Sequence, residues 1–304
     1  MTDILAIGEP LVELNQPGDG APFKQGFGGD TSNAMIAAAR LGARAGYFTA
    51  VGADRFGEDL VALWKAEGVD ASRIVVNGGA HTGIYFVNHG PDGHVFSYLR
   101  AGSAASRLTE ADTPAEAIRA ARLLHVSGIS QAISSSAADL VFAAIDAARQ
   151  ARVLVSYDTN LRLKLWPLRR ARAITHEAMR FCDIALPSLD DAIQLTGETT
   201  PDAILDFYLR LGAQVVALKL GREGSAVATP ELRERVAPFP VKAIDATGAG
   251  DAFDGAFLSE YLIHGDPFAA ARFANVAAAL STLGFGAVAP LPRRPEVLAA
   301  LTKG

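Results

Sequence analysis

The segment Asp245-Ala246-Thr247-Gly248-Ala249-Gly250-Asp251 places two acids and two glycines directly before a run with helical spacing of apolar residues. Glycines let backbone N–H groups converge, and the N-terminus of a helix attracts anions. Asp251, in the first turn of that helix, would hold a carboxylate beside an anion. This pairing suits phosphoryl transfer, in which amides stabilise the moving phosphoryl group and an acid accepts the proton of the attacking hydroxyl. The same residues also fit a plain N-capped helix after a glycine-rich turn.

A second glycine-rich element, Gly26-Phe27-Gly28-Gly29-Asp30-Thr31-Ser32-Asn33, also leads into a predicted helix. The glycines allow a close approach of the backbone to a ligand. Asp30 and Asn33 offer hydrogen-bond acceptors and donors to a polyol. The structural alternative is an ordinary loop with an Asp or Thr helix cap.

The elements that must position these segments alternate between short apolar strands and helices. The predicted strands are 4–7, 46–51, 123–126, 153–157, 184–186 and 215–218, and the predicted helices are 31–41, 57–67, 115–121, 137–151, 171–181, 204–211, 268–283 and 295–301. Such alternation predicts an α/β fold with a mostly parallel sheet covered by helices on both faces. Residues 16–29 are punctuated by glycine and proline and are predicted to be loop and turn.

One region departs from the alternation. The β-rich runs 81–88 and 95–100 flank Gly90-Pro91-Asp92-Gly93, which predicts a β-hairpin. The run 11–14 alternates and is expected to join the same sheet. Together these runs predict a small antiparallel flap inserted into the α/β domain.

Polar residues follow several predicted strands. In open parallel sheets, ligands bind beyond the carboxyl ends of the strands. The residues at these ends are Asp158, Asn160 and Arg162 after 153–157, Ser188 and Asp191 after 184–186, Lys219 and Gly221 after 215–218, and 245–251 after an expected strand at 241–244. Successive polar strand ends define a crevice, which favours an enzyme over a binding module.

Composition excludes several classes of function. The chain has 304 residues, of which 50% are hydrophobic, enough for one large domain or two small ones. Its net charge of -5 argues against nucleic acid as a partner. Cys182 is the single cysteine, so intrachain disulfides are excluded, and we expect it to be a buried apolar residue.

Targeting and motif signals narrow the classes further. The N-terminus lacks the pattern of a signal peptide, and no uninterrupted apolar run reaches the roughly 20 residues of a membrane helix, so a cytoplasmic enzyme is expected. The sequence contains neither the Walker phosphate-loop signature nor G-x-G-x-x-G after the first strand. It also lacks the H-E-x-x-H zinc motif and the G-x-S-x-G hydrolase elbow.

The two glycine-rich elements together resemble the two signatures of the ribokinase-like (PfkB) carbohydrate kinases. The first continues into Arg40-Leu41-Gly42 and Val51-Gly52-Ala53-Asp54-Arg55-Phe56-Gly57, and the second continues into Ala252-Phe253. The resemblance implies a single three-layer α/β/α domain over residues 1–304, with a β-sheet lid from about 10–25 and 81–103. It also implies ATP-dependent phosphorylation of a sugar hydroxyl with Mg²⁺.

By position, the resemblance implies a role for each motif residue. Asp251 is the general base, with Gly248, Ala249 and Gly250 as the anion hole. The implied ATP-binding residues are Asn160, Ser188, Lys219, Gly221, Gly224, Gly248, Gly250 and Asn275. Asp191 is implied to bind Mg²⁺ through water, and Asp245 and Thr247 to form a K⁺ loop. Ser188 and Asp191 stand where the family has Asn and Glu, so the metal site departs from the family pattern.

Several strings resemble one branch of the family, the 2-keto-3-deoxygluconate kinases. They include 8–14, 28–33, 127–130, 158–166 and 284–288. The implied substrate-binding residues are Gly29, Asp30, Asn33, Tyr85, Tyr98, Arg100, Ile129 and Arg162.

Charge at the predicted hairpin supports that branch. Tyr85 and Tyr98 lie on opposite arms and could close over a sugar, and Arg100 shares a strand face with Tyr98. A guanidinium matches a carboxylate, which a neutral sugar lacks. The alternative is edge-strand packing by the tyrosines and a solvated charge at Arg100.

The resemblance and the charge at the hairpin thus imply an ATP:2-keto-3-deoxygluconate 6-kinase. Such an enzyme would catalyse a step of sugar-acid breakdown. The alternatives are a fructokinase or ribokinase acting on a neutral sugar, and a non-catalytic sugar-binding regulatory protein. An exposed apolar lid edge predicts a homo-oligomer formed through the lid, and neither nucleic acid nor membrane is an expected partner.

Overall fold

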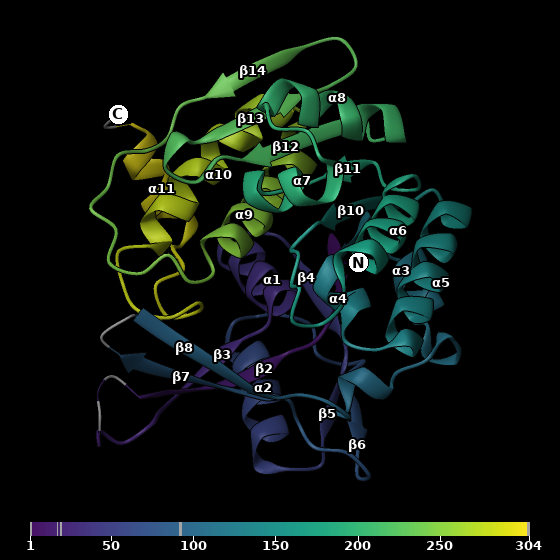
Figure 1. Cartoon of the computed structure of the whole chain (residues 1–304), viewed down its shortest axis with the longest axis vertical. Helices are drawn as coiled ribbons and strands as arrows, with labels where there is room; N and C mark the ends of the chain where they lie inside the picture. Colours follow the sequence, from purple (N-terminus) through teal and green to yellow (C-terminus); the bar gives the residue numbers. More distant parts are fainter. Residues whose placement is uncertain (1, 17, 19, 91–92, 303–304) are drawn as a thin grey trace.

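The main sheet organises the molecule. The computed structural model describes residues 2–16, 18, 20–90 and 93–302. Over these residues the main sheet has eight strands in the order β14-β13-β12-β11-β10-β9-β1-β4 (Figure 1). Their bounds are β1 Ile4–Ile7, β4 Ala45–Phe48, β9 Leu123–Ser127, β10 Leu154–Asp158, β11 Ile184–Ala185, β12 Val215–Lys219, β13 Ser225–Ala228 and β14 Arg233–Val236. The pairs from β4 to β12 are parallel, whereas β13 and β14 are antiparallel.

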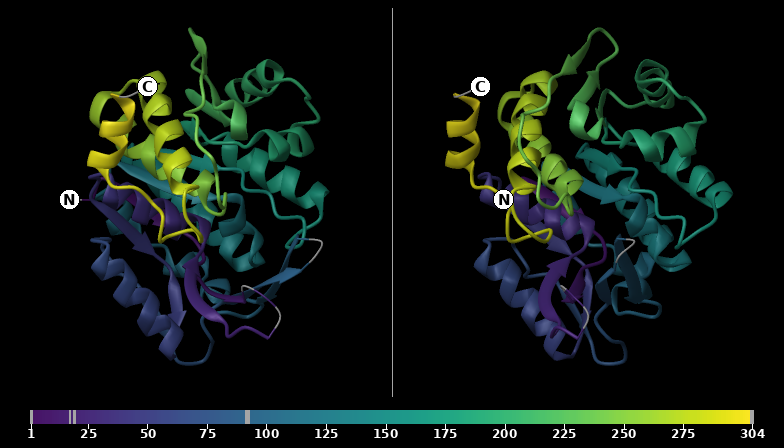
Figure 2. Two further views of the ribbon diagram at one scale, coloured as in Figure 1. Left: turned by 90° about the vertical axis from the view of Figure 1, so that its left-hand side faces the viewer. Right: turned by 60° about the vertical axis from the view of Figure 1, so that its left-hand side comes forward.

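Helices cover both faces of the main sheet, as the sequence predicted. Because successive side chains of a strand point to opposite faces, Ile4 and Ala6 enter one apolar core, whereas Leu5 and Ile7 enter the other. One layer contains α1 Asp30–Arg40, α2 Arg55–Ala66, α9 Ala249–His264, α10 Pro267–Ser281 and α11 Arg294–Leu301. The other contains α3 Ala115–Arg119, α5 Ser135–Ala151, α6 Leu168–Met179, α7 Leu189–Thr196 and α8 Pro201–Leu211. Figure 2 shows the sheet between the two layers.

The helix after the second glycine element is more deeply buried than its spacing suggested. The sequence predicted one apolar face on α9, but residues 252–260 are all buried. The reason is that α9 packs against α1 on one flank and α10 on another. Asp254 and Glu260 therefore lie in the interior, where charged side chains need partners.

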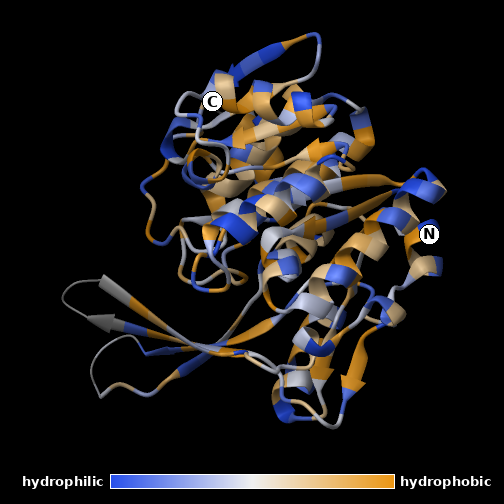
Figure 3. Ribbon diagram, turned by 45° about the vertical axis from the view of Figure 1, so that its right-hand side comes forward, coloured by the Kyte–Doolittle hydropathy of each residue, from blue (hydrophilic) through white to orange (hydrophobic). Residues whose placement is uncertain are grey.

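A second sheet, the lid sheet, projects from the body (Figure 3). In the order β3-β2-β7-β8 it contains β3 Lys24–Gly28, β2 Leu11–Gln16, β7 Ile84–Gly90 and β8 Gly93–Leu99. The predicted hairpin is present as β7 and β8, and β2 joins it as expected. The prediction of an antiparallel flap was wrong in one respect, because the β2–β7 pair is parallel and the lid sheet is therefore mixed. Pro91 and Asp92 of the predicted turn lie outside the described residues.

The Val-Gly-x-Asp-x-Phe-Gly string joins the lid sheet to the body. Asp54 caps α2 by accepting a hydrogen bond from the Gly57 amide at 2.8 Å. The same carboxylate accepts bonds from the amide and hydroxyl of Thr82, just before β7. Asp54 therefore connects the start of α2 to the chain segment that enters the lid sheet.

Three strand predictions were wrong. Residues 16–29 are not all loop, because β3 forms by antiparallel pairing with β2. The expected strand 46–51 is divided into β4 and β5 Ala50–Gly52, and β5 pairs instead with β6 Val75–Asn77. Residues 241–244 are not a strand, since the Ile244 amide is held by the Thr282 carbonyl at the end of α10.

Two simpler expectations can be compared directly with the structure. Cys182 is buried, as expected, and packs in the core beside α5 and α8. Among the described residues, no helix combines the length and apolar character needed to cross a membrane.

Candidate active site

The first turn of α9 has the geometry expected of an anion site. Gly248 caps the helix with a positive φ of 74°, a conformation that favours glycine. A Cβ at Gly248 would also lie 2.9 Å from the Cβ of Ala287. Ala249 and Gly250 open the helix, and Asp251 lies in its first turn. The Ala249 amide donates to the Ala246 carbonyl at 3.1 Å, so it is not free for an anion as the resemblance implied, but the helix dipole still favours a bound anion at this end.

The two glycine-rich elements meet at Asp251. Asn33 Nδ2, in α1, donates a hydrogen bond to Asp251 Oδ2 at 2.8 Å. Gly29 caps α1 with φ 105°, and a Cβ there would lie 2.5 Å from the Glu9 carbonyl oxygen. Burial, followed by the charge of Asp30, raises the pKa of Asp251 to about 7, while the Asn33 hydrogen bond opposes the rise. A carboxylate with this pKa suits a general base near neutral pH.

Three of the predicted polar residues gather behind this pair. Asp30 Oδ2 accepts a hydrogen bond from Asn160 Nδ2 at 2.9 Å, which joins α1 to the end of β10. Arg162 is exposed, and its charge acts on both Asp30 and Asp191. Burial raises the pKa of Asp30. Asn33 Oδ1 is buried and has no hydrogen-bond partner within the described part of the chain, so it can accept from a ligand.

The predicted apolar contact, Ile129, lies at the edge of the same group. It is buried in the short helix α4 Gly128–Ala132, directly after β9. A Cβ at Gly128 would collide with the Thr159 carbonyl oxygen, so the helix lies close against the chain after β10. This packing places Ile129 near Asn160 in the fold.

The lid sheet presents two stacked tyrosines. Tyr85 and Tyr98 are opposite one another in the β7–β8 register, and their ring centroids are 6.0 Å apart. The Tyr85 hydroxyl donates to Glu13 of β2, which shares the same row. Burial raises the pKa of Tyr85, and the charges of Glu13 and Asp251 add to the rise. Tyr85 is therefore close enough to Asp251 for the charge of that carboxylate to act on it.

Arg100 is less available to a ligand than the sequence suggested. It forms a buried ion pair with Glu9, whose other oxygen accepts a hydrogen bond from Ser103 at 2.9 Å. The guanidinium also lies over the Tyr98 ring, 5.5 Å from its centroid. One donor stays open, because Arg100 Nε is buried without a hydrogen-bond partner among the described residues.

Lys219, which the sequence assigned to ATP, is held by two acids. Its Nζ lies 3.0 Å from Asp158 Oδ1 and 2.9 Å from Asp254 Oδ1. All three side chains are buried, so the ammonium is neutralised within the protein. A Cβ at Gly250 would come to 3.9 Å from Nζ, which places this ammonium beside the anion site.

The residue implied for Mg²⁺, Asp191, lies with Ser188 at the start of α7. Ser188 caps α7, and Asp191, in the first turn of that helix, accepts a hydrogen bond from the Leu161 amide at 3.0 Å. Burial raises the pKa of Asp191, and the charge of Asp158 adds to the rise. Among the described residues, no group of three or more His, Cys, Asp or Glu side chains could hold a metal ion. The protein therefore offers Mg²⁺ a single carboxylate at a time. Such a site can hold Mg²⁺ when phosphate groups and water supply the remaining ligands.

The remaining predicted ATP residues surround one loop. Gly221 opens a short 3₁₀ turn with φ 58°, and Gly224 ends it with φ 84°. A Cβ at Gly224 would collide with the chain at 236–238. Asn275 Nδ2, in α10, donates to the carbonyls of the same segment, at 3.2 Å to Val236 and 3.0 Å to Ala237. Asn275 and Gly224 thus meet at this segment, but the Asn275 amide nitrogen is bonded to backbone.

The residues of the predicted K⁺ loop are hydrogen-bonded to each other and to a remote segment. Asp245 Oδ1 accepts from the Thr247 amide at 2.9 Å and from the Thr247 hydroxyl at 2.7 Å. Asp245 Oδ2 accepts from the Gly286 amide at 2.9 Å. These bonds join the segment before α9 to the 284–288 string.

Three residues of this site were not predicted: Glu9, Glu13 and Asp254. A signal was present for Asp254, because an acid in the middle of an apolar helix requires a buried partner. Glu9 and Glu13 lie in the 8–14 string that resembles the 2-keto-3-deoxygluconate kinases, but nothing in that string gave either acid a partner or a role. Their partners, Arg100 and Tyr85, are known only from the folded chain.

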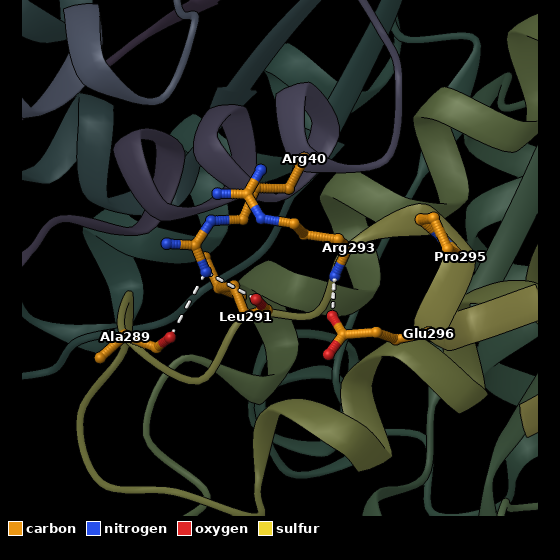
Figure 4. A pocket seen from close by; sticks show the side chains of 6 residues that line it. All are labelled: Arg40, Ala289, Leu291, Arg293, Pro295 and Glu296. Atoms are coloured by element: carbon orange, nitrogen blue, oxygen red, sulfur yellow. Dashed lines mark hydrogen bonds between the residues drawn. The ribbon is translucent and has the colours of Figure 1, made fainter. Parts of the chain in front are cut away.

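A pocket of about 480 Å³ lies elsewhere on the surface (Figure 4). Its lining residues are Arg40, Ala289, Leu291, Arg293, Pro295 and Glu296. Arg40 donates to the Leu291 carbonyl at 2.6 Å and forms an ion pair with Glu67, so its positive charge is balanced within the protein. This pocket lies between α1 and the C-terminal segment, and none of the residues predicted for the active site lines it.

Comparisons with known proteins show similarity to carbohydrate kinases over nearly the whole chain. The sequence model described as pfkB family carbohydrate kinase matches residues 1–294. The chain is 36% identical to the 2-dehydro-3-deoxygluconokinase of Thermoproteus tenax, covering 98% of this chain and 94% of that protein. It is 33% identical to the 2-dehydro-3-deoxygluconokinase of Bacillus subtilis (92% and 88% covered). It is also 33% identical to Fructokinase-1 of Oryza sativa subsp. japonica (97% and 96% covered).

Solved structures share the fold over the whole chain. A PfkB protein from Polaromonas sp. JS666 matches with a TM-score of 0.90 and 32% identity, covering 98% of this chain and 100% of that one. A candidate ribokinase II from E. coli, in complex with ATP and Mg²⁺, matches with a TM-score of 0.92 and 25% identity, covering all of both chains. A fructokinase double mutant from Vibrio cholerae, bound to fructose, ADP and potassium, matches with 0.90 and 29%, covering 99% and 98%.

Proposed function

The chain belongs to the pfkB family of carbohydrate kinases, and we propose that it transfers the γ-phosphoryl group of ATP to the terminal hydroxyl, O6, of 2-keto-3-deoxygluconate. This sugar acid is the 2-dehydro-3-deoxygluconate named in two of its relatives. The observation that carries the proposal is the carboxylate of Asp251, which Asn33 holds at the N-terminus of α9.

Asp251 acts as the general base. Its carboxylate accepts the proton of the terminal hydroxyl as the oxygen attacks the γ-phosphorus, and the bond to the β-phosphate oxygen breaks with its electrons leaving on ADP. Asn33 orients the carboxylate through one oxygen, so the other can face the sugar. The amides of Gly248 and Gly250 stabilise charge on the transferred group because they are pre-aligned at a helix N-terminus, and the Ala249 amide could join them only by leaving the Ala246 carbonyl.

ATP and Mg²⁺ fit the donor set of this site. The αL cap at Gly248 and the positive helix end suit phosphate, and the carbonyl-bound Asn275 borders the segment expected to hold the adenine. Asp191 supplies one carboxylate for a metal ion shared with phosphates, and Mg²⁺ would neutralise phosphate charge there. The Asp245–Thr247 turn is the proposed K⁺ loop. This proposal is tested by comparing the turnover rate in buffers that contain K⁺ with the rate in buffers that contain Na⁺.

The lid sheet would cover the sugar. Tyr85 and Tyr98 present one aromatic face, and closure over the sugar would exclude water that could hydrolyse ATP. The outer strand β8 also exposes Val95, Phe96 and Leu99. A second copy of the chain could cover this edge, and sedimentation of wild type against Phe96→Lys tests the oligomer proposed through the lid.

Arginine side chains support a sugar acid over a neutral sugar. Arg100 keeps Nε without a partner among the described residues, beside the stacked tyrosines, and Arg162 is exposed and its charge acts on Asp30. A substrate carboxylate can be matched by either guanidinium. Fructokinase activity is the second candidate, supported by the similar identity to a plant fructokinase and by the pairing of Arg100 with Glu9.

One assay separates the candidates. Purified protein is supplied with ATP, Mg²⁺ and, in separate reactions, 2-keto-3-deoxygluconate, 2-keto-3-deoxygalactonate, fructose and ribose, and ADP release is followed. Preference for a keto-deoxy sugar acid is expected. Turnover with neutral sugars alone would overturn the substrate, and no turnover with any sugar would favour a non-catalytic sugar-binding protein.

A further inference from the structure

A buried cluster of three charged side chains lies directly behind the first turn of α9. Lys219 Nζ, at the end of β12, is 3.0 Å from Asp158 Oδ1, at the end of β10. It is also 2.9 Å and 3.0 Å from the two carboxylate oxygens of Asp254 in α9. The exposed fractions of the side chains are 11% for Lys219, 6% for Asp158 and 1% for Asp254. Three elements that are remote in sequence therefore share one ammonium.

The cluster is placed where it can control the geometry of the site. Asp254 follows Asp251 by about one turn of α9, so the two acids lie on neighbouring parts of one helix face. The ammonium also lies against the backbone of that turn, because a Cβ at Gly250 would come within 3.9 Å of Nζ. Burying charge in this way is costly and is often neutral or unfavourable for stability. A role in alignment explains why the charges are kept.

We propose that Asp254 is a positioning residue for phosphoryl transfer, which together with Asp158 clamps the Lys219 ammonium behind α9 and so holds Gly250 and Asp251 in register with the ends of β10 and β12. The inference rests on the proposed kinase function, but not on the identity of the sugar.

Burial and neighbouring charges shift the pKa values of the two acids in the clamp in opposite directions. Burial and the charge of Asp158 raise the pKa of Asp254. Burial also acts on Asp158, but the Lys219 ammonium outweighs it and holds the pKa of Asp158 below its usual value. His125 is buried beside them, and burial lowers its pKa to about 4, so it stays neutral. Asp158 is thus the more acidic of the two carboxyls, and an amide at position 254 keeps the shape of the Asp254 side chain and one of its two acceptor oxygens.

The clamp also acts on the base. Burial and the charges of Asp30 and Asp158 raise the pKa of Asp251, whereas Asn33 and Lys219 lower it. From the lid sheet, Tyr85 interacts with the charge of Asp251. Removing the ammonium should therefore make Asp251 a weaker acid, even if its position were unchanged.

The test compares Asp254→Ala, Asp254→Asn and Glu260→Ala with wild type, using whichever sugar supports turnover. Glu260 is the matched control, because it is also buried in α9 and pairs with Arg294 at 2.8 Å, far from the catalytic end. Asp254→Ala should lower kcat roughly tenfold or more, since small misplacements of reacting groups are costly. The KM for ATP should stay within about twofold, and Asn should restore most of kcat. Glu260→Ala should lower Tm but leave kcat unchanged.

A measurement without turnover accompanies the kinetics. The carboxyl of Asp251 is titrated by ¹³C NMR in wild type and in Lys219→Met, whose apolar chain preserves most of the volume. Its pKa should rise in the variant. This arm still decides the proposal if Asp254→Ala does not fold, and if no sugar supports turnover.

Three results would overturn the clamp: full kcat in Asp254→Ala, an equal loss of kcat in Glu260→Ala, or an unchanged Asp251 titration in Lys219→Met. Activity of the wild type on neutral sugars alone would remove the sugar-acid substrate, yet leave the comparison of Asp254 with Glu260 intact.

Discussion

Asn33 Nδ2 donates a hydrogen bond to Asp251 Oδ2 at 2.8 Å, although 218 positions separate the two residues. Each residue lies in the first turn of a helix that begins after a glycine with positive φ, Gly29 for α1 and Gly248 for α9. The bond therefore joins the two glycine-rich elements into one site. It also lowers the pKa of Asp251 against the larger effects of burial and of Asp30.

Replacing Asn33 should change the pH dependence of the reaction. In Asn33→Ala the hydrogen bond that lowers the pKa of Asp251 is lost, so the acidic limb of kcat/KM should move to higher pH. Asn33→Asp adds a negative charge beside Asp251 and should move it further. The measurement is the pH–rate profile of each variant, and identical profiles for all three proteins would contradict this role.

The wild-type protein should lose activity as the pH falls through about 7. Burial, followed by the charge of Asp30, raises the pKa of Asp251 to about 7, and only the ionised form can accept the proton. Activity is therefore expected to rise with pH and to be half-maximal near that value. Asp251→Asn should abolish turnover but keep ATP binding, as measured by calorimetry. Turnover by this variant with an unshifted profile would assign the base elsewhere.

Gly248→Ala should cost both stability and activity. The residue has φ 74°, where a side chain costs about 1–2 kcal/mol, and its new Cβ would meet Ala287 at 2.9 Å. Gly265→Ala is the matched control, since it lies at the other end of α9 with φ 70° and open space around it. Both variants should lower Tm, but only Gly248→Ala should lower kcat. Equal kcat in the two would argue against an anion site at Gly248.

Arg100→Ala should distinguish a sugar acid from a neutral sugar. A charged hydrogen bond contributes about 1.5–3 kcal/mol, so the KM for the sugar acid should rise roughly tenfold to a hundredfold, and the KM for fructose much less. Steady-state kinetics with both sugars provide the measurement. Equal effects on the two substrates would place the carboxylate away from Arg100.

Glu9→Gln should increase the preference for the acid. The substitution removes the buried charge that now pairs with Arg100, which leaves the guanidinium for a substrate carboxylate. Ser103→Ala is the control, because it removes a hydrogen bond to Glu9 without changing charge. The ratio of kcat/KM for the sugar acid to that for fructose should rise in Glu9→Gln alone. A fall would mean that Glu9 orients Arg100 rather than competing for it.

Local pattern was sufficient for the centre of the fold but not for its edges. Continuous apolar runs such as 153–157 identify buried parallel strands because they must be covered on both faces. The strand 24–28 carries lysine, glutamine and glycines, and it becomes a strand only through pairing with β2. The edge strand 233–236 is mostly charged and exposed, and pairing with β13 likewise defines it.

The site divides in the same way. Residue types and spacing were enough to nominate the glycine turn, Asp251 and Asn33, because helix starts and turns obey local rules that short strings satisfy. The partners of the charged side chains were decided by the folded chain: Lys219 lies between Asp158 and Asp254, and Arg100 lies against Glu9. Such pairings depend on the distances between strand ends and helices that are remote in sequence. Because a buried charge needs an opposite charge nearby, each side chain pairs with the one that the fold places close to it.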